Sequence, residues 1–483
     1  IRDTEHMFYR LDLFQKVLEE HAQSQHSRWK SNVRAMTKQW LDMGLRPRAV
    51  TRDLSWGISL PMGGEKWDGK CVYVWFEAVQ GYLTCSQIWS ENHANNSDAW
   101  ESWWTNSESS NPRHYYFLGK DNVPFHTVIW PAIIMGLNHV RNGKNADDDI
   151  DLPSNGDLHL EDNVPAMEYL MLSGGQFSKS RKHAVWLPSF LDRFDPDTLR
   201  YYLGINMPEN HDSVFNWPDF VEKINSELIA AYGNFVHRVL TLGARLEMTA
   251  QGPFSPFDDL STTYEVQEKL TSLHEQITES LHRHRYKEAL RFAMNAAQTG
   301  NQMLQAATPW KFLKTEGDDE YISLRNTSLS RLAFGWRISR YLAIVMQPFL
   351  PFSSAKLWKA LGQEGVVTDV HWDSAIDWTV PMSWNNATPE PLFKRLDLEE
   401  ILASEQSLVD SKESVEQPGH SVKGGKKSKK KSKGENDMTD APEGTTYLNF
   451  ETFMEVDLRV GKISAVEDHP CLLYTSPSPR DRG

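Results

Sequence analysis

The chain has 483 residues, and its 51 basic against 65 acidic side chains give a formal net charge of −14. This length allows about three domains of ordinary size, and 40% apolar residues are typical of folded globular proteins. The longest nearly apolar stretch, residues 128–137, is about half the length of a membrane span, so we expect no membrane insertion. The three cysteines lack the spacing of a zinc knuckle or a disulfide framework, which favours a reducing compartment and no metal site.

In the first half of the chain, segments typical of strands alternate with segments typical of helices. Residues 72–76 and 114–118 are short apolar runs, and each leads through a loop into a helical pattern such as 128–136. This alternation predicts an α/β fold with a parallel sheet that binds ligands at the carboxyl ends of its strands. Residues 138–160 are rich in Asn and Asp, so we expect a surface insertion there.

The second half is predominantly helical. Apolar residues recur every three or four positions in 224–242, 266–281 and 332–346, which predicts the amphipathic helices of a bundle. From residue 401 to 446 this periodicity is lost and Ser, Gly, Lys and Glu increase, which predicts a disordered linker. The linker contains seven lysines in the eleven residues 423–433.

Two blocks of the first half carry residues suited to ligand binding. In Trp75–Tyr82, the two bulky end residues follow a strand and could wall a pocket for a flexible apolar side chain. In Phe117–His126, Gly119 at a strand end lets a ligand approach the backbone. Asp121 is then placed to accept hydrogen bonds from ribose hydroxyls. Each block, taken alone, also fits an ordinary structural role.

A third block, Gly174–Arg181, combines glycines with Ser178, Lys179 and Ser180 in a loop. Hydroxyls, backbone N–H groups and an ammonium group are what a polyphosphate requires. The block is not a P-loop, because the spacing G-x-x-x-x-G-K-[ST] is absent. A basic surface loop is the alternative interpretation.

In this order, the three blocks closely resemble those of methionyl-tRNA synthetases, a family of class I aminoacyl-tRNA synthetases. The V-Y-V-W-F-D-A block of the family matches Val72–Ala78, its F-x-G-K-D-N-x-P-F-H block matches Phe117–His126, and its signature loop matches Phe177–Ser180. Asp219–Phe220 and the helix 227–238 resemble the start of the family's anticodon-binding bundle. The resemblance covers residues 3 to 400, roughly.

The resemblance implies a fold class and a domain order. The fold class is α/β: the second half of a class I synthetase Rossmann-like nucleotide-binding domain, followed by an all-α anticodon-binding bundle, a disordered linker and the beginning of an OB-fold. The expected divisions are 1–160 for the Rossmann-like part, 161–220 for the signature-loop and stem-contact region, 221–400 for the bundle, 401–446 for the linker, 447–470 for the OB-fold start, and 471–483 for an artefactual tail.

The chain also departs from the family pattern. The family's His-x-Gly-His signature, which contacts ATP, does not occur, and Gln176 replaces the first lysine of the signature loop. Glu77 replaces an Asp, and Val79-Gln80 stand where Pro-Ile or Thr-Ile is usual. We therefore expect a fragment without the beginning of the enzyme, which by itself does not form methionyl-adenylate.

The resemblance implies roles for individual residues. The catalytic residues would be Lys179, Ser178 and Ser180; the ATP-binding residues Gly119, Asp121, Phe177 and Lys179; the methionine-binding residues Trp75, Ala78, Tyr82, Asn122 and His126; the anticodon-reading residues Asn234, Arg238 and Trp310; and the tRNA phosphate-binding residues Lys429, Lys430 and Lys431.

Two local patterns support the anticodon residues. Asn234 and Arg238 are four positions apart, so a helix places them on one face. Thr308-Pro309 predicts an N-cap followed by a first-turn proline, which puts Trp310 in the first turn of a helix. An aromatic ring with amide and guanidinium donors is suited to recognising unpaired RNA bases.

The function implied by the resemblance is that of a methionine–tRNA ligase. Its substrates would be methionine, ATP with Mg²⁺, and tRNA(Met); further multi-synthetase or auxiliary tRNA-binding partners are an open expectation. We expect a cytoplasmic location, with the mitochondrion as the alternative. The competing hypotheses are a non-catalytic tRNA-binding or assembly module and a class I synthetase for cysteine or leucine. Trp75 with Tyr82 argues against leucine, and no cysteine pair could build the zinc–thiolate site expected for cysteine.

Overall fold

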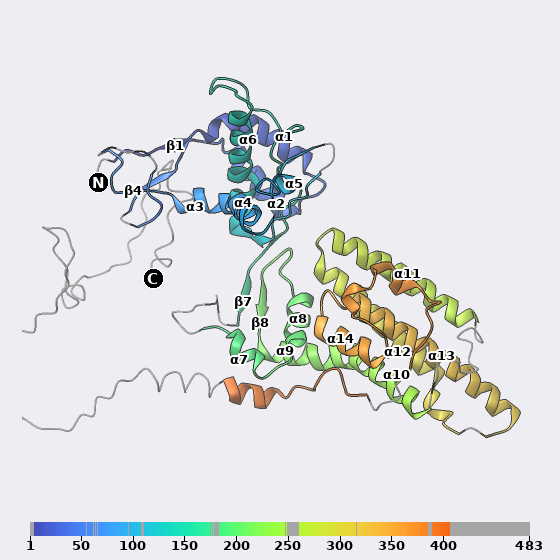
Figure 1. The fold of residues 1–483 in the computed structure, drawn as a ribbon. Helices are drawn as coiled ribbons and strands as arrows, with labels where there is room; N and C mark the ends of the chain where they lie inside the picture. The colour runs from blue at the N-terminus through green and yellow to red at the C-terminus, as the bar shows by residue number, and fades with distance from the viewer. Residues whose placement is uncertain are drawn as a thin grey trace, which may run out of the picture. The chain divides into compact units, whose positions relative to one another are not determined.

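The computed structural model describes residues 4–405, except 55, 61, 63, 65, 95, 108–110, 174, 176, 178–182, 247, 249–259, 315 and 385–388. The chain divides into two compact units, Ile1–Ser414 and Val415–Gly483, and all described residues belong to the first (Figure 1). Most of the expected linker, the OB-like block and the tail therefore lie outside the described residues, as do Ser178, Lys179, Ser180 and Lys429–Lys431. In the part that is described, no helix is long and apolar enough to cross a membrane.

The first part of the chain combines short strands with helices. Its helices are α1 (Gln15–Ser24), α2 (Ser31–Asp42), α3 (Val74–Glu77), α4 (Gly81–His93), α5 (Glu101–Trp104) and α6 (Trp130–Arg141). Its strands are β1 (Phe8–Tyr9), β2 (Arg48–Ala49), β3 (Thr51–Asp53), β4 (Lys70–Val72), β5 (Leu118–Gly119), β6 (Ala166–Met167) and β7 (Leu170–Leu172), with β8 (Ser213–Phe215) from further along the chain.

The strands form small two-stranded sheets. β1 pairs with β2 and β3 with β4 in antiparallel fashion, whereas β5 pairs with β6 and β7 with β8 in parallel. The prediction of parallel pairing is thus confirmed. The strand expected at 72–76 is wrong beyond Val72: Tyr73 still donates its N–H to the Val50 carbonyl, but the carbonyl of Tyr73 then accepts from Phe76 and Glu77, which starts α3.

A buried aspartate ties together several segments of this part. Asp162 accepts hydrogen bonds from Arg113 Nη1 (2.7 Å), His159 Nε2 (2.8 Å) and Arg28 Nη1 (3.2 Å), and from the backbone N–H of His114 (2.9 Å). Burial by itself would raise the pKa of this carboxyl, but the donors, His159 first among them, hold it far below its usual range. These contacts fix the segment that leads into β5.

The expectation of a surface insertion at 138–160 is only partly correct. Helix α6 continues to Arg141, and Asn138 is buried, with its side-chain amide donating to the carbonyl of Leu158 (3.0 Å) and accepting from its N–H (2.8 Å). Leu158 and Leu160 belong to the same buried cluster as Trp130. A buried amide with both groups paired holds the two ends of this range in the core, and the residues between them, 141–152, are mostly exposed.

The second part is a helical bundle, as the sequence predicts. Its helices are α7 (Leu187–Leu191), α8 (Pro196–Ile205), α9 (Trp217–Lys223), α10 (Asn234–Arg245), α11 (Leu260–His282), α12 (Tyr286–Ala307), α13 (Asp319–Val345) and α14 (Pro351–Ala360). A π-helical segment, Ile224–Gly233, connects α9 to α10 without a break. α12 lies between α11 and α13 in the bundle (Figure 1).

The bundle core is rich in aromatic side chains. Phe235 of α10 and Phe334 and Trp336 of α13 are fully buried in one hydrophobic cluster. Gly300 of α12 lets α10 approach closely, because a Cβ at this position would lie 2.6 Å from the Phe235 ring. A further helix at 398–405 packs Ile401 into the same cluster, so the first residues of the range expected to be linker belong to the folded part.

Candidate functional site

The structure brings together the first and second sequence blocks. Trp75 on α3 stacks on Phe125, with ring centroids 5.0 Å apart and an interplanar angle of 27°. Phe125 begins the π turn Phe125–Ile129 that leads into α6, so the stack connects α3 to α6. Trp75 remains 45% exposed and Ala78 is exposed, so both can face a ligand. Sequence reasoning did not assign a role to Phe125, although it lies inside the second block.

Three of the predicted methionine-binding residues form a hydrogen-bonded chain. His126 Nδ1 lies 2.9 Å from the carbonyl oxygen of Asn122, and His126 Nε2 lies 2.8 Å from the hydroxyl of Tyr82. Because a carbonyl oxygen can only accept, Nδ1 carries the proton and donates it. In the neutral ring Nε2 is then an acceptor, and it receives the hydroxyl proton of Tyr82.

The surroundings of the two titratable side chains, His126 and Tyr82, favour the neutral form of each. His126 is only 6% exposed, and burial lowers the pKa of its imidazole. Burial also raises the pKa of the Tyr82 hydroxyl, so the phenol keeps its proton. Tyr82 leans against the ring of Tyr116 (4.9 Å), and Tyr116 accepts a hydrogen bond from Trp130 Nε1 (2.9 Å). The result is an aromatic, uncharged wall that is held in place by hydrogen bonds.

Two of the predicted ATP-binding residues, Gly119 and Asp121, lie at the carboxyl end of β5. Gly119 ends this strand opposite Met167 of β6, and a Cβ at Gly119 would meet no atom within 4 Å. The open space above Gly119 fits a position where a ligand approaches the backbone. Asp121 follows in a 3-10 turn and is exposed.

Asp121 has a partner that sequence reasoning missed. The hydroxyl of Tyr169 donates to Asp121 Oδ2, and this hydrogen bond is the main cause that raises the pKa of Tyr169 to about 12. Tyr169 lies 48 residues further along the chain, and the parallel pairing of β5 with β6 helps to bring the two together. A carboxylate has about four acceptor positions, so Asp121 can hold a ribose hydroxyl beside Tyr169.

Lys120, between Gly119 and Asp121, is committed to other groups. Its ammonium donates to Glu168 Oε2 (2.7 Å) and Asp212 Oδ1 (3.1 Å), and these contacts, the one with Glu168 first, raise its pKa. The ammonium also lies 4.3 Å from the ring centroid of Tyr169. Lys120 therefore orders the strand end around Asp121.

The signature loop is described only in part. After β7, the N–H and carbonyl of Leu172 pair with those of Gly175 (3.0 and 2.9 Å), and Gly175 adopts φ +143°. Phe177 is exposed. The remaining members of the predicted phosphate-binding loop, Ser178, Lys179 and Ser180, lie outside the described residues.

The predicted anticodon residues meet on the bundle. The guanidinium of Arg238 lies 4.7 Å from the ring centroid of Trp310, a cation–π contact, and its Nη2 donates to Gln305 Oε1 (3.4 Å). Asn234 is exposed one turn earlier on the same helix. Gln305, on the last turn of α12, was not predicted.

The local structure at Trp310 differs from the prediction. Thr308 makes no capping hydrogen bond; it has φ 43° and ends α12 in the left-handed conformation. Pro309–Lys311 then forms one 3-10 turn, which carries Trp310 partly buried against the bundle core. The first-turn proline is confirmed, but the N-cap is replaced by a helix C-cap.

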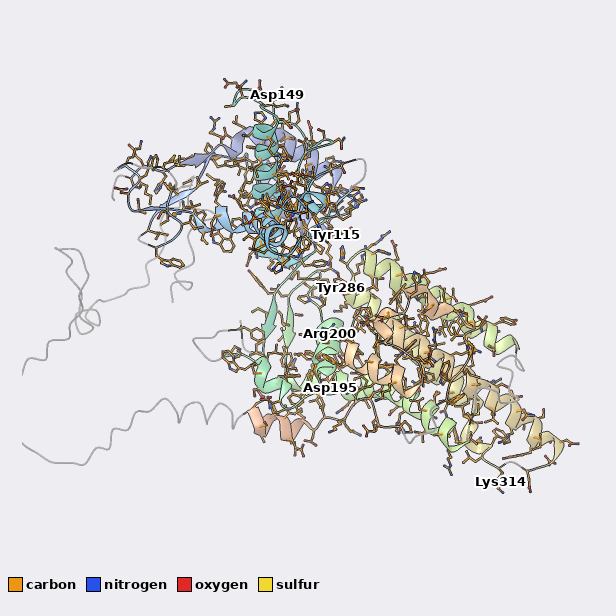
Figure 2. The ribbon with its side chains drawn as sticks, viewed as in Figure 1. Tyr115, Asp149, Asp195, Arg200, Tyr286 and Lys314 are labelled. Atoms are coloured by element: carbon orange, nitrogen blue, oxygen red, sulfur yellow. The ribbon has the colours of Figure 1, made fainter. Side chains whose placement is uncertain are left out.

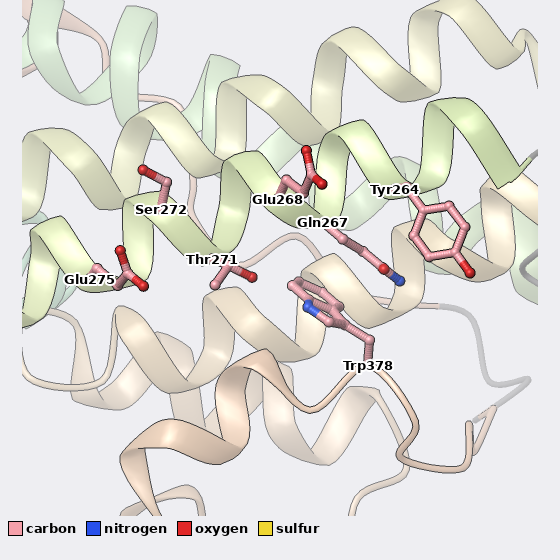
Figure 3. A pocket seen from close by; sticks show the side chains of 7 residues that line it. All are labelled: Tyr264, Gln267, Glu268, Thr271, Ser272, Glu275 and Trp378. Carbon is pink, nitrogen blue, oxygen red and sulfur yellow. The ribbon is translucent and has the colours of Figure 1, made fainter.

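A shallow depression elsewhere on the bundle contains none of the predicted site residues. It has a volume of about 380 Å³, and it is lined by Tyr264, Gln267, Glu268, Thr271, Ser272 and Glu275 of α11 and by Trp378 (Figure 3). Across the described ranges, no group of three or more His, Cys, Asp and Glu side chains is placed to hold a metal ion.

Comparison with known proteins follows the same division of the chain. Residues 1–240 match the family model of tRNA synthetases class I (M), and residues 257–409 match that of the anticodon binding domain of methionyl tRNA ligase. The methionine–tRNA ligase of Porphyromonas gingivalis is 36% identical over 97% of this chain, which spans 61% of that relative's length. The methionine–tRNA ligase of Roseiflexus castenholzii is 35% identical over 85% of this chain, which covers 69% of it.

Solved structures of similar fold are also found. The free methionyl-tRNA synthetase of Mycobacterium tuberculosis superimposes with a TM-score of 0.63 at 20% identity, covering 82% of this chain and 70% of that one. The form bound by methionyl-adenylate gives 0.62 at 20% identity, with 80% and 68% covered.

Proposed function

Because the chain belongs to the methionyl-tRNA synthetase family of class I tRNA synthetases, we propose that it serves to activate methionine with ATP and to transfer it to tRNA(Met). Its fold is the Rossmann-like part of such a synthetase followed by the anticodon-binding bundle. The observation that carries the proposal is the chain Tyr82–His126–Asn122, which builds a neutral aromatic wall beside the strand end with Gly119 and Asp121.

The wall suits the side chain of methionine. A thioether is flexible, uncharged and polarisable, and it contacts aromatic rings favourably. Trp75, stacked on Phe125, and Tyr82 supply such rings, whereas the neutral His126 places no charge beside the sulfur. Ala78 adds a small surface, and Asn122 keeps the imidazole in its tautomer through the backbone carbonyl.

The first step is an attack of the methionine carboxylate on the α-phosphate of ATP, with pyrophosphate as the leaving group. Such chemistry requires positioning and stabilisation of charge. Asp121 accepts from the ribose, and Phe177 lies near the nucleotide. Lys120 is paired with Glu168 and Asp212. We assign the contact with pyrophosphate to Lys179, with Ser178 and Ser180 as donors, because their block resembles the signature loop of the family. Mg²⁺ accompanies ATP as part of the substrate.

In the second step, the methionyl group passes to a terminal ribose hydroxyl of the tRNA. The bundle selects this tRNA through Asn234, Arg238 and Trp310. In the structure Arg238 covers the face of Trp310, so a base that stacks on this ring displaces the guanidinium, which becomes free to donate to the base. Lys429, Lys430 and Lys431 contribute contacts to phosphates without regard to sequence. We place this activity in the cytoplasm.

The test is a pair of binding measurements on the chain. Calorimetric titration should give tighter binding of methionine than of leucine, and His126→Ala should remove this preference. A tRNA with the methionine anticodon should bind at least about tenfold more tightly than one with an altered anticodon. Equal affinity in both comparisons refutes the proposal, and selective tRNA binding without methionine binding favours the non-catalytic module instead.

A further inference from the structure

The turn between α11 and α12 concentrates positive charge in an acidic chain. Residues 282–287 read His-Arg-His-Arg-Tyr-Lys, whereas the whole chain has a net charge of −14. The guanidinium groups of Arg283 and Arg285 are about half exposed or more, with side-chain exposures of 60% and 52%. Each contacts one exposed carboxylate of the adjoining helix: Arg283 contacts Glu279 of α11, and Arg285 contacts Glu288 of α12. Exposed pairs of this kind are weak and exchange easily for other anions.

Further cations face this turn from neighbouring elements. The ammonium of Lys30 is buried without a hydrogen-bond partner; burial lowers its pKa, Glu209 opposes this shift and Arg285 adds to it. Lys287 faces Arg291 and Lys223 as well as Glu209. The six cations of this region, Lys30, Lys223, Arg283, Arg285, Lys287 and Arg291, face five acids, Glu209, Asp219, Glu227, Glu279 and Glu288.

Exposed aromatic rings adjoin these cations. Tyr115 and Phe117, on the segment leading into β5, are 46% and 58% exposed. Both pack against His284 of the turn with ring centroids 5.3 Å away, and Phe117 also lies 6.4 Å from Tyr286. Figure 2 labels Tyr115 and Tyr286 of the two segments. His284 reaches them because it adopts φ 55°, a left-handed conformation that is rare for a residue other than glycine. Aromatic rings beside a cluster of cations are typical of surfaces that bind nucleic acids.

The position of the turn relates it to the anticodon residues. Helix α12 begins at Tyr286 and ends at Ala307, three residues before Trp310. At about 1.5 Å per residue, its 22 residues span about 33 Å. The two residues that follow Phe117 lead to Gly119 at the strand end described above. The turn therefore lies between the anticodon-reading end of the bundle and the nucleotide end of β5.

We propose that the α11–α12 turn, with Arg283 and Arg285 at its surface and Tyr115 and Phe117 beside it, binds the sugar–phosphate backbone of tRNA about 33 Å from Trp310. This surface is separate from the residues that read the anticodon, and it does not distinguish sequences, because guanidinium groups contact phosphates. The proposal rests on the proposed function, since it takes tRNA as the substrate. Its role is to orient a tRNA already held at Trp310 so that the acceptor end faces Gly119 and Asp121.

The test measures tRNA binding by the full chain as a function of salt concentration. Each phosphate contact contributes about 0.7–0.9 to the slope of log affinity against log salt, so R283A/R285A should reduce the slope by about 1.4–1.8 for whole tRNA(Met). R283K/R285K should retain the slope, because lysine keeps the charge. Lys359→Ala, an exposed lysine of α14, is the matched control and should change nothing.

A second RNA separates the surface from the anticodon site. In an anticodon stem–loop of five base pairs, the stem extends at most about 17 Å at 3.4 Å per pair, so it does not reach the turn. Its affinity should fall with Trp310→Ala and stay unchanged with R283A/R285A. An unchanged slope for whole tRNA, or an equal loss on the stem–loop, overturns the proposal. If the wild-type chain also fails to distinguish anticodons and to prefer methionine over leucine, the proposed function itself is refuted.

Discussion

Replacing Tyr82 by phenylalanine removes one hydrogen-bond donor, the phenol hydroxyl, from the aromatic wall and tests the tautomer assigned to His126. In the wild type, Nε2 of the buried imidazole accepts the Tyr82 hydroxyl at 2.8 Å. Leaving a buried acceptor without a donor costs about 1–3 kcal/mol. Tyr82 is itself 43% exposed, so water can reach part of the vacated position. We therefore expect the free energy of unfolding to fall by about 1 kcal/mol, near the lower end of that range.

The assay is urea unfolding of the wild type, Tyr82→Phe, His126→Ala and the double variant. The two single changes should be non-additive by about 1 kcal/mol, because they remove the same hydrogen bond. Tyr264→Phe, an exposed tyrosine of α11, is the control and should stay within about 0.5 kcal/mol of the wild type. Nitrogen NMR of His126 should show a protonated Nδ1 and an unprotonated Nε2. Additive effects, or a proton on Nε2 in the neutral ring, would refute the assignment.

Three further predictions follow from other contacts. Trp310→Ala should weaken binding of tRNA with the methionine anticodon about tenfold or more, since stacking contributes roughly 1–3 kcal/mol per base. Methionine titration of the same variant should be unchanged, and weaker methionine binding would mean that Trp310 supports the fold and does not read the anticodon. Asp162→Asn should lower the free energy of unfolding, measured in urea, by about 3 kcal/mol, because the buried carboxylate binds two arginines and a histidine. A loss below about 0.5 kcal/mol would contradict the role of Asp162 in holding these segments together. Because burial lowers the pKa of His126, the unfolded chain binds more protons than the folded one below about pH 6.5. The contribution of this residue to the free energy of unfolding should therefore be complete above that pH and be lost as the pH falls through the lowered pKa. His126→Gln should flatten this dependence in urea unfolding between pH 7.5 and 5.5, and an unchanged profile would argue against a buried neutral imidazole.

In α13, every residue from Leu332 to Val345 is buried except Arg337, so this part of the helix is buried on all sides and is not amphipathic as expected. The sequence nevertheless predicts the helical bundle well, because apolar residues at helical spacing mark its helices. It also predicts that Arg238 and Asn234 share a face, since that relation depends on local geometry alone. The contact of Arg238 with Gln305 could not be read in this way, because it joins two helices whose approach is set by packing at Gly300.

Local patterns are less informative where the partner lies far along the chain. The apolar run 72–76 has the composition of a strand, yet only its first residue is in β4, because the backbone beyond Tyr73 turns into α3. The hydrogen bond from Tyr169 to Asp121 depends on the parallel pairing of β5 and β6. Composition identified the residue types of the site, whereas the pairing of strands determined which of them meet.

The π-helical segment Ile224–Gly233 affects how the bundle tolerates changes in length. Each turn of a π-helix takes in one residue more than a turn of α-helix. Losing one residue from this segment can therefore be absorbed by rewinding a π turn into an α turn, with α10 keeping its orientation. Losing one residue within α10 instead rotates everything after it by about 100°. A loss before Arg238 would turn this side chain away from Trp310. The wide turns therefore allow this helix to change length without losing the contact between Arg238 and Trp310.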